Sequence, residues 1–269
     1  MKGKSWKHAC QGGTKQCSRS AVLGGMLVLL TLLPVAAGAF ETTGREIVEK
    51  CFDYMRGKAS VAELEMTIHR PDWKRSMSIK VWTKGEKKSF FVITSPARDK
   101  GNATLKKGRE MWMFNPKVNR VIKLPPSMMS QAWLGSDFSN NDLSKTDSLK
   151  LDYEHTILGT EKQGDGKVYL IQSMPKPGAP VVWGMQKLRI REDGIMLEET
   201  FFDEDMEPVK KLSMSEIEMM GGRLYPSFWK MEQSDKKGHY TTVAYKSLEF
   251  KASLPSRYFT LSNLRNPRR

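Results

Sequence analysis

The first hydrophobic pattern that indicates an element of the folded domain is a stripe at helical spacing. Its apolar members recur every three or four positions, which places them on one face of a helix: Ile47, Val48, Cys51, Phe52 and Met55. Thr42 or Thr43 can cap this helix, and Glu46 is placed for a capping box. Gly57 can end it. We therefore predict an amphipathic helix running to about residue 55.

After Gly57 the hydrophobic period changes to two. In residues 62–68 the apolar Leu64, Met66 and Ile68 alternate with polar residues, as in a strand with one wet face. The pattern repeats along the chain, with turn signals such as Asp193-Gly194 between the runs. It predicts an antiparallel meander, which can form a sandwich, a barrel or a curved open sheet. The predicted strands are 62–68, 76–82, 88–94, 102–106, 109–114, 118–123, 150–158, 167–173, 185–192, 195–203, 207–218, 223–233, 239–246 and 257–261.

Residues 124–148 interrupt the strand pattern. An irregular segment of about 25 residues is uncommon inside a domain and typical of a lid or a binding loop. Ser127 can begin a short helix through Leu134, which Gly135 can end. We call residues 127–138 the lid segment. A lid held by Met and Trp side chains can open without breaking a specific polar network.

The oxygen-rich run 137–142 raises the question of a calcium site. It lacks the glycine at loop position six and the acid at position twelve of an EF-hand loop. We therefore interpret Asp137, Ser139 and Asn140 as turn and cap formers.

The N-terminal residues have the three parts of a secretory signal peptide. Residues 1–20 carry basic side chains and no acid, and residues 21–33 form an apolar run too short to span a bilayer. That length disfavours an uncleaved anchor helix. Small residues then lead to a cleavage site after about Ala39, and no cysteine follows it directly. We expect a periplasmic protein without a lipid anchor, with residues 40–269 forming a single domain.

The chain is basic, with 44 Lys and Arg against 30 Asp and Glu. The predicted leader holds five of the basic residues and none of the acids, so the remainder stays basic. Export and the lack of a nucleic-acid-binding motif argue against nucleic acid as a partner. A solvated surface, or attraction to anionic lipid headgroups, remains as the explanation of the charge.

Sequence motifs for catalysis and metal binding are absent. His69, His155 and His239 stand far apart, and none has the spacing of metal ligands. No nucleophile elbow or phosphate-binding loop occurs. Cys51 has no partner for a disulfide once the leader is removed, and we interpret it as a small core residue. We predict no catalytic residue, no metal and no cofactor.

Residues 111–114 (MWMF) are apolar on both faces of a predicted strand. Met111 and Met113 share one face, and Trp112 and Phe114 share the other. One face can pack on a helix while the other lines a cavity, and both can equally be core.

These features together resemble the LolA-like family of outer membrane lipoprotein-sorting proteins, within the LolA/LolB lipoprotein carrier superfamily. The resemblance covers residues 45–260 and rests on three runs: MWMFNPKVNRVIKLPPSMM at 111–129, WLGSDFSNNDL at 133–143 and VVWGMQKLRIREDGIMLEETFFDEDMEPVKKL at 181–212. It implies a mainly β fold, a curved antiparallel half-barrel of about 10–12 strands. An N-terminal helix and a short lid helix would cover its concave face.

The resemblance also implies a function, that of a non-enzymatic carrier or chaperone. Such a protein would hold the acyl chains of lipoproteins or phospholipid in a hydrophobic cavity for transfer to the outer membrane. An inner-membrane transporter is a possible partner, and we expect a monomer. Two alternatives stay open: an accessory subunit of an RND-type lipid exporter that handles no lipid itself, and an enzyme acting on envelope lipid or glycan. The residues expected at the cavity and lid are Trp112, Phe114, Met128, Met129, Trp133, Leu134 and Phe138.

Overall fold

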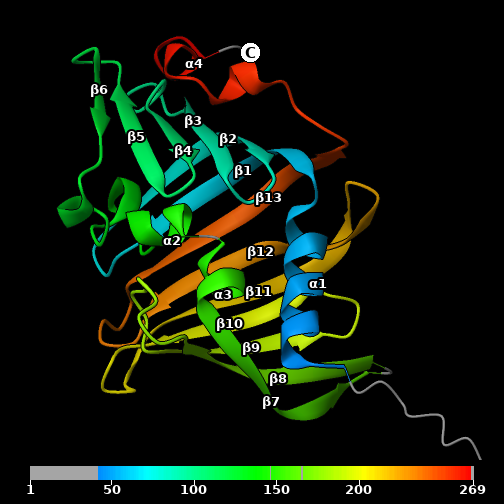
Figure 1. Cartoon of the computed structure of the whole chain (residues 1–269). Coiled ribbons are helices and arrows are strands. Elements are labelled where there is room, and N and C mark those ends of the chain that lie inside the picture. Colours follow the sequence, from blue (N-terminus) through cyan, green and yellow to red (C-terminus); the bar gives the residue numbers. More distant parts are fainter. Residues whose placement is uncertain (1–41, 146, 165, 268–269) are drawn as a thin grey trace, which may run out of the picture. The chain divides into compact units, whose positions relative to one another are not determined.

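The structure is a computed structural model that describes residues 42–145, 147–164 and 166–267 (Figure 1). This part of the chain holds one 13-stranded antiparallel sheet, in the order β6-β5-β4-β3-β2-β1-β13-β12-β11-β10-β9-β8-β7. The sheet curves without closing, and β6 and β7 are its edges (Figure 1). The strands are β1 Ala59–His69, β2 Lys74–Lys84, β3 Lys88–Ser95, β4 Ala103–Lys107, β5 Glu110–Asn115, β6 Arg120–Lys123, β7 Tyr153–Gln163, β8 Gly166–Pro175, β9 Met185–Arg191, β10 Met196–Phe202, β11 Pro208–Met220, β12 Arg223–Gln233 and β13 Tyr240–Lys251.

The chain builds this sheet as two meanders that meet at β1 and β13. Strands β1 to β6 follow one another outward on one side, and β13 back to β7 on the other. The junction pairs Ala59 with Lys251 and His69 with Tyr240, so the first and last strands meet along most of their length. Residues from both ends of the chain therefore share one concave face.

Side-chain alternation decides which residues reach that face. In β1, Ala62 and Met66 are buried and point to the same side as Leu64, while Glu63 points to the other side and is exposed. The period-two pattern that predicts this strand from the sequence is thus the alternation between concave face and solvent.

Helix α1 (Gly44–Arg56) packs across the concave face (Figure 1). Thr43 caps it in a reciprocal capping box with Glu46, and Gly57 ends it, which confirms the helix predicted from the sequence. The start of α1 sits close against β7, since a Cβ on Gly44 would lie 2.7 Å from the carbonyl oxygen of His155. Cys51 lies on the buried face of this helix, and its burial raises the pKa of its thiol.

The mainly β half-barrel with covering helices is confirmed, with 13 strands among the described residues where the resemblance implied fewer. The predicted strand 257–261 is wrong. Ser256–Phe259 forms a 3₁₀ turn (η3) after Pro255, and Thr260 caps the short helix α4 (Leu261–Arg265). The predicted signal peptide and its cleavage site lie outside the described residues.

The C-terminal segment covers the convex face of the first meander. Phe259 and Leu264 are buried there against Trp82, Phe90 and Leu105. Both faces of this meander are therefore packed, which explains its apolar strands. Within the described residues, no helix is long and apolar enough to cross a membrane.

Candidate functional site

The segment between β6 and β7 folds as short separate turns. Two 3₁₀ turns, η1 (Pro126–Met128) and η2 (Trp133–Gly135), precede the helices α2 (Asn140–Ser144) and α3 (Ser148–Asp152). The predicted helix from Ser127 through Leu134 is wrong, because Leu134 has a left-handed backbone, with φ of 54°. Ser139 caps α2 in a capping box with Asp142, which confirms it as a cap former.

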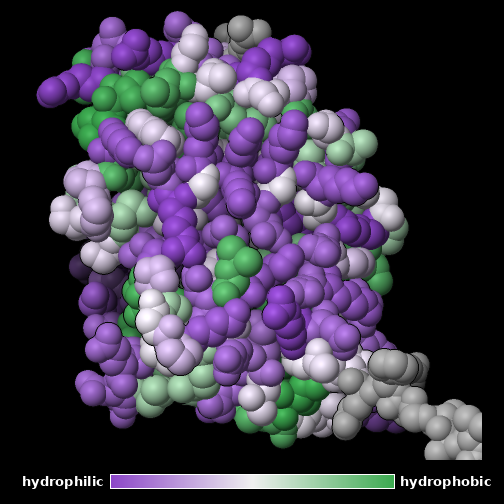
Figure 2. All heavy atoms as spheres, in the orientation of Figure 1, coloured by the Kyte–Doolittle hydropathy of each residue, from purple (hydrophilic) through white to green (hydrophobic). Residues whose placement is uncertain are grey.

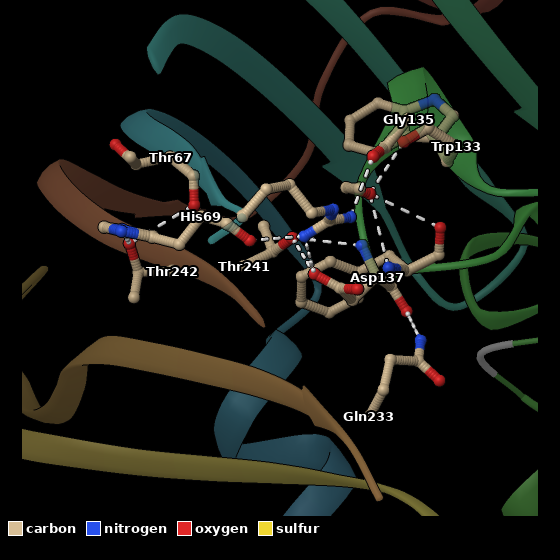
Figure 3. A network of polar contacts seen from close by, with 11 residues as sticks. Thr67, His69, Trp133, Gly135, Asp137, Gln233, Thr241 and Thr242 are labelled. Atoms are coloured by element: carbon tan, nitrogen blue, oxygen red, sulfur yellow. Dashed lines mark hydrogen bonds and ion pairs between the residues drawn. The ribbon is translucent and has the colours of Figure 1, made fainter. Parts of the chain in front are cut away.

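A buried ion pair ties the lid segment to the sheet (Figure 3). Arg70, just beyond β1, donates from Nη1 to Asp137 Oδ2 at 3.0 Å and from Nη2 to the carbonyl oxygen of Gly135 at 3.2 Å. Thr241 on β13 donates to the same Asp137 oxygen at 2.6 Å and accepts from the Asp137 backbone N–H at 3.0 Å. The expectation of a lid without a polar network is therefore wrong.

Trp133 anchors the lid segment from within. It is buried, it donates from Nε1 to Thr104 Oγ1 at 3.1 Å, and its ring meets Phe91 edge to face, with centroids 5.3 Å apart. Ser136 donates to the carbonyl oxygen of Trp133 at 2.6 Å and holds the turn that presents the ring. The lid segment is thus tied to the sheet and forms a wall of the concave space.

A cavity of about 350 Å³ lies between the concave face of the sheet, α1 and the α2–α3 region. Its volume is at the low end of the range for small-molecule sites. The outer surface of the helices that cover it is mainly hydrophilic (Figure 2). Apolar lining comes from α1, from both meanders and from the lid segment, and includes Met55, Leu64, Phe91, Trp133, Phe138, Met214 and Trp229.

The structure brings part of the predicted site together. Trp133 and Phe138 line the cavity. Met128, Met129 and Leu134 pack beside it, on the cluster around Trp133, and are not among the lining residues.

Trp112 and Phe114 lie elsewhere. They face the convex side, where they pack with the C-terminal residues Leu254 and Phe259, so their expected place in the cavity is corrected. Met111, on the other face of β5, packs in the cluster around Trp133 instead. The sequence could not distinguish the two faces because both are covered.

The β11 side of the cavity holds an ion pair. Lys210 on β11 is buried and pairs with Asp142 on α2. Its ammonium also lies 4.9 Å from the ring centroid of Trp183 and 5.1 Å from that of Phe201. This pair fastens α2 to the concave face.

Glu199 on β10 lines the cavity beside this pair. Burial, and after it the negative charge of Asp142, raises the pKa of Glu199 from 4.5 to about 8, against the lowering effect of Lys210. The carboxyl group is therefore protonated in the folded protein at neutral pH.

Stability should consequently fall as the pH rises from about 4.5 to about 8. The unfolded chain loses the proton of Glu199 in this window while the folded chain keeps it, so deprotonation favours unfolding. We expect Glu199→Gln to flatten this part of the pH profile of the free energy of unfolding and to be more stable than the wild type at pH 8. Glu198→Gln, on the neighbouring residue, should keep the wild-type slope. Parallel slopes for Glu199→Gln and the wild type would contradict the assignment.

Arg56 lines the cavity at the end of α1. Its Nε donates to the carbonyl oxygen of Gly85 at 2.6 Å, and its Nη2 to Ser89 Oγ at 2.7 Å. Burial lowers the pKa of its guanidinium, although the neighbouring Tyr245 and Tyr225 act in the opposite direction.

Sequence reasoning missed these polar lining residues. The sequence did not indicate Glu199 as a cavity residue, because a register shift between Met196 and Glu198 changes which side of β10 faces the cavity. Arg56 directly follows the apolar stripe of the predicted helix. This position at the helix end is the sequence feature that could have indicated a place beside the cavity. Within the described ranges, no group of three or more His, Cys, Asp or Glu side chains is placed to hold a metal ion.

Comparisons with known proteins agree with this fold. A family model described as an uncharacterized protein matches residues 85–266, more than half of the chain. No curated protein matches significantly.

Solved structures share the architecture. A DUF1329 family protein from Desulfovibrio piger is 24% identical, with a TM-score of 0.72 over 82% of this chain and 97% of its own. A LolA superfamily protein from Nitrosomonas europaea is 24% identical, with a TM-score of 0.67 over 82% of this chain and 99% of its own. A putative outer membrane lipoprotein-sorting protein domain from Vibrio parahaemolyticus is 19% identical, with a TM-score of 0.70 over 83% and 98%. The chain belongs to the family of uncharacterized proteins that the matching model describes, and it shares its fold with these three solved structures, among them a LolA superfamily protein.

Proposed function

We propose that this protein is a periplasmic carrier that encloses acyl chains of a lipoprotein or a phospholipid and transfers them to the outer membrane. The observation that carries the proposal is the cavity on the concave face, with its predominantly apolar lining. The name of the Vibrio parahaemolyticus relative, a putative outer membrane lipoprotein-sorting domain, supports the same role. Residues 1–39 would act as the export signal.

The chemistry of the lining suits an acyl chain. Each CH₂ group removed from water contributes about 0.8 kcal/mol, and an alkyl chain makes no hydrogen-bond demand on the wall. Met55, Met66 and Met214 add flexible, polarisable surface that can adapt to chains of different shape. Release to a membrane would then depend on the competing apolar environment of the acceptor.

The cavity also favours a carrier over the two alternatives. An accessory subunit that handles no lipid has no use for an apolar space beneath its helices. For an enzyme, the polar residues of the cavity would need paired groups poised for proton transfer. Arg56 and Tyr153 instead donate to backbone carbonyl oxygens, of Gly85 at 2.6 Å and of Trp183 at 3.0 Å.

A lipid-transfer assay tests the proposal. Donor vesicles carry a self-quenched fluorescent phospholipid or diacylated peptide, and acceptor vesicles carry no label. The protein should accelerate dequenching in proportion to its concentration, because each molecule shuttles cargo between the two populations. A transfer rate that stays at the protein-free level for both cargoes would overturn the carrier function.

A further inference from the structure

We propose that the cavity is built for an anionic amphiphile, with the carboxylate or phosphate of its headgroup bound against Arg56 and the alkyl chain along the apolar wall. This inference rests on the proposed carrier function and names the chemical class of its cargo.

Arg56 is a half-buried cation, and within the described residues its side-chain hydrogen bonds all go to neutral acceptors. These are the carbonyl oxygens of Gly85 and Lys88 and the hydroxyl of Ser89, all on the β2–β3 hairpin. Within the described part of the chain no carboxylate lies at ion-pair distance from it; Glu86 and Asp147 act on its charge from farther away. A buried charge without a counter-charge is costly, so an anion entering the cavity would compensate it.

The other charged groups of the lining are already satisfied or neutral. Asp142 pairs with Lys210, and burial favours the protonated form of Glu199. Lys145 donates to the carbonyl oxygen of Pro180 at 2.7 Å in an exposed contact, so solvent screens its charge. Arg56 is therefore the group at which a ligand anion gains most.

A row of hydroxyl groups runs across the sheet beside Arg56. The strand registers pair Ser60 with Thr83 and Thr83 with Ser89, and all three residues line the cavity. Ser60 Oγ and Thr83 Oγ1 lie 2.7 Å apart, and Ser89 accepts from Arg56. Hydroxyls beside a guanidinium supply the several donors that the oxygens of a carboxylate or phosphate require.

Further groups extend this polar end. Tyr225 and Tyr245 also line the cavity, with ring centroids 5.3 Å apart. The register continues from Ser89 to the buried Lys106 on β4. Burial, and after it the positive charge of Arg56, lowers the pKa of Lys106 to about 8. A polar, cationic end joined to an apolar wall is the complement of an anionic amphiphile.

A headgroup series tests this inference. The probes are alkyl chains of one length that end in a carboxylate, a phosphate, a hydroxyl or a trimethylammonium group, titrated calorimetrically into delipidated protein. The carboxylate and the phosphate should bind about ten- to a hundredfold more tightly than the alcohol, since hydrogen bonds to charged groups are the stronger class. The trimethylammonium probe should bind most weakly. The ranking of carboxylate against phosphate would distinguish a fatty-acid cargo from a phospholipid-like one.

Arg56→Gln should remove the preference for the anionic probes while leaving the affinity for the alcohol unchanged. Arg45→Gln is the matched control, because Arg45 is on the same helix with its side chain 68% exposed. If Arg56→Gln fails to fold, Tyr245→Phe serves instead, and it should reduce the preference for the anions without changing alcohol binding.

The outcomes distinguish the proposed headgroup site from the proposed carrier function. Equal affinity for all four probes, or an anion preference that survives both Arg56→Gln and Tyr245→Phe, would overturn the headgroup site while leaving the carrier function standing. Failure of every probe to bind would overturn the carrier function itself.

Discussion

Asp137→Ala is expected to lower the free energy of unfolding by about 3–5 kcal/mol, because it breaks a buried ion pair by removing one partner. The side chains of Arg70 and Asp137 are only 13% and 4% exposed. The substitution leaves the Arg70 guanidinium buried without a counter-charge and takes the acceptor away from Thr241. The lid segment would lose its charged tie to the ends of β1 and β13 and would keep the backbone contacts of Gly135 with Arg70 and of residue 137 with Thr241.

Urea denaturation followed by tryptophan fluorescence measures this change. Glu110→Ala is the matched control, since it breaks a pair with Lys123 in which both side chains are more than half exposed. Exposed pairs contribute about 0–1 kcal/mol, so the control should stay near the wild type. A loss of under about 1 kcal/mol in Asp137→Ala would contradict the tethering assigned to this network.

Leu64→Trp is expected to weaken the binding of an acyl probe by about a hundredfold. Leu64 is half-buried and lines the cavity, so a larger ring at this position extends into the space that the chain occupies. Excluding about four methylene groups costs about 3 kcal/mol, which corresponds to this loss of affinity. The measurement is a titration with a fluorescent fatty acid.

Glu63→Trp is the control for this substitution. Glu63 is the preceding residue, its side chain is 56% exposed, and it points to the other face of β1. The same ring placed there should leave probe affinity unchanged, although it removes the exposed pair with Lys80. Similar affinities in the two variants would show that the probe binds outside the cavity.

Much of the fold could be predicted from local sequence patterns. The capping box of Thr43 and Glu46 and most of the period-two strands are encoded within a few residues of each element, and the structure contains them. The strand predicted at 257–261 failed because Pro255 and the cap at Thr260 favour short helical turns there. A short apolar run has too little periodicity to distinguish a strand from a short helical turn.

The candidate site was less predictable because its contacts are long-range. Arg70 and Asp137 stand 67 positions apart, and Lys210 and Asp142 stand 68 apart. A repeating pattern of apolar residues within one helix or strand does not indicate a contact between residues so far apart in the sequence. Trp133 and Phe138 could be placed at the cavity because they belong to the irregular segment that covers the concave face.

Native mass spectrometry of the protein purified from cells without detergent tests the central claim, that the concave cavity holds an acyl lipid. Wild-type protein and Glu63→Trp should carry the added mass of a lipid or an acylated peptide, and Leu64→Trp should appear at the mass of the bare chain. A bare mass for all three proteins, or the same bound lipid on all three, would contradict the account.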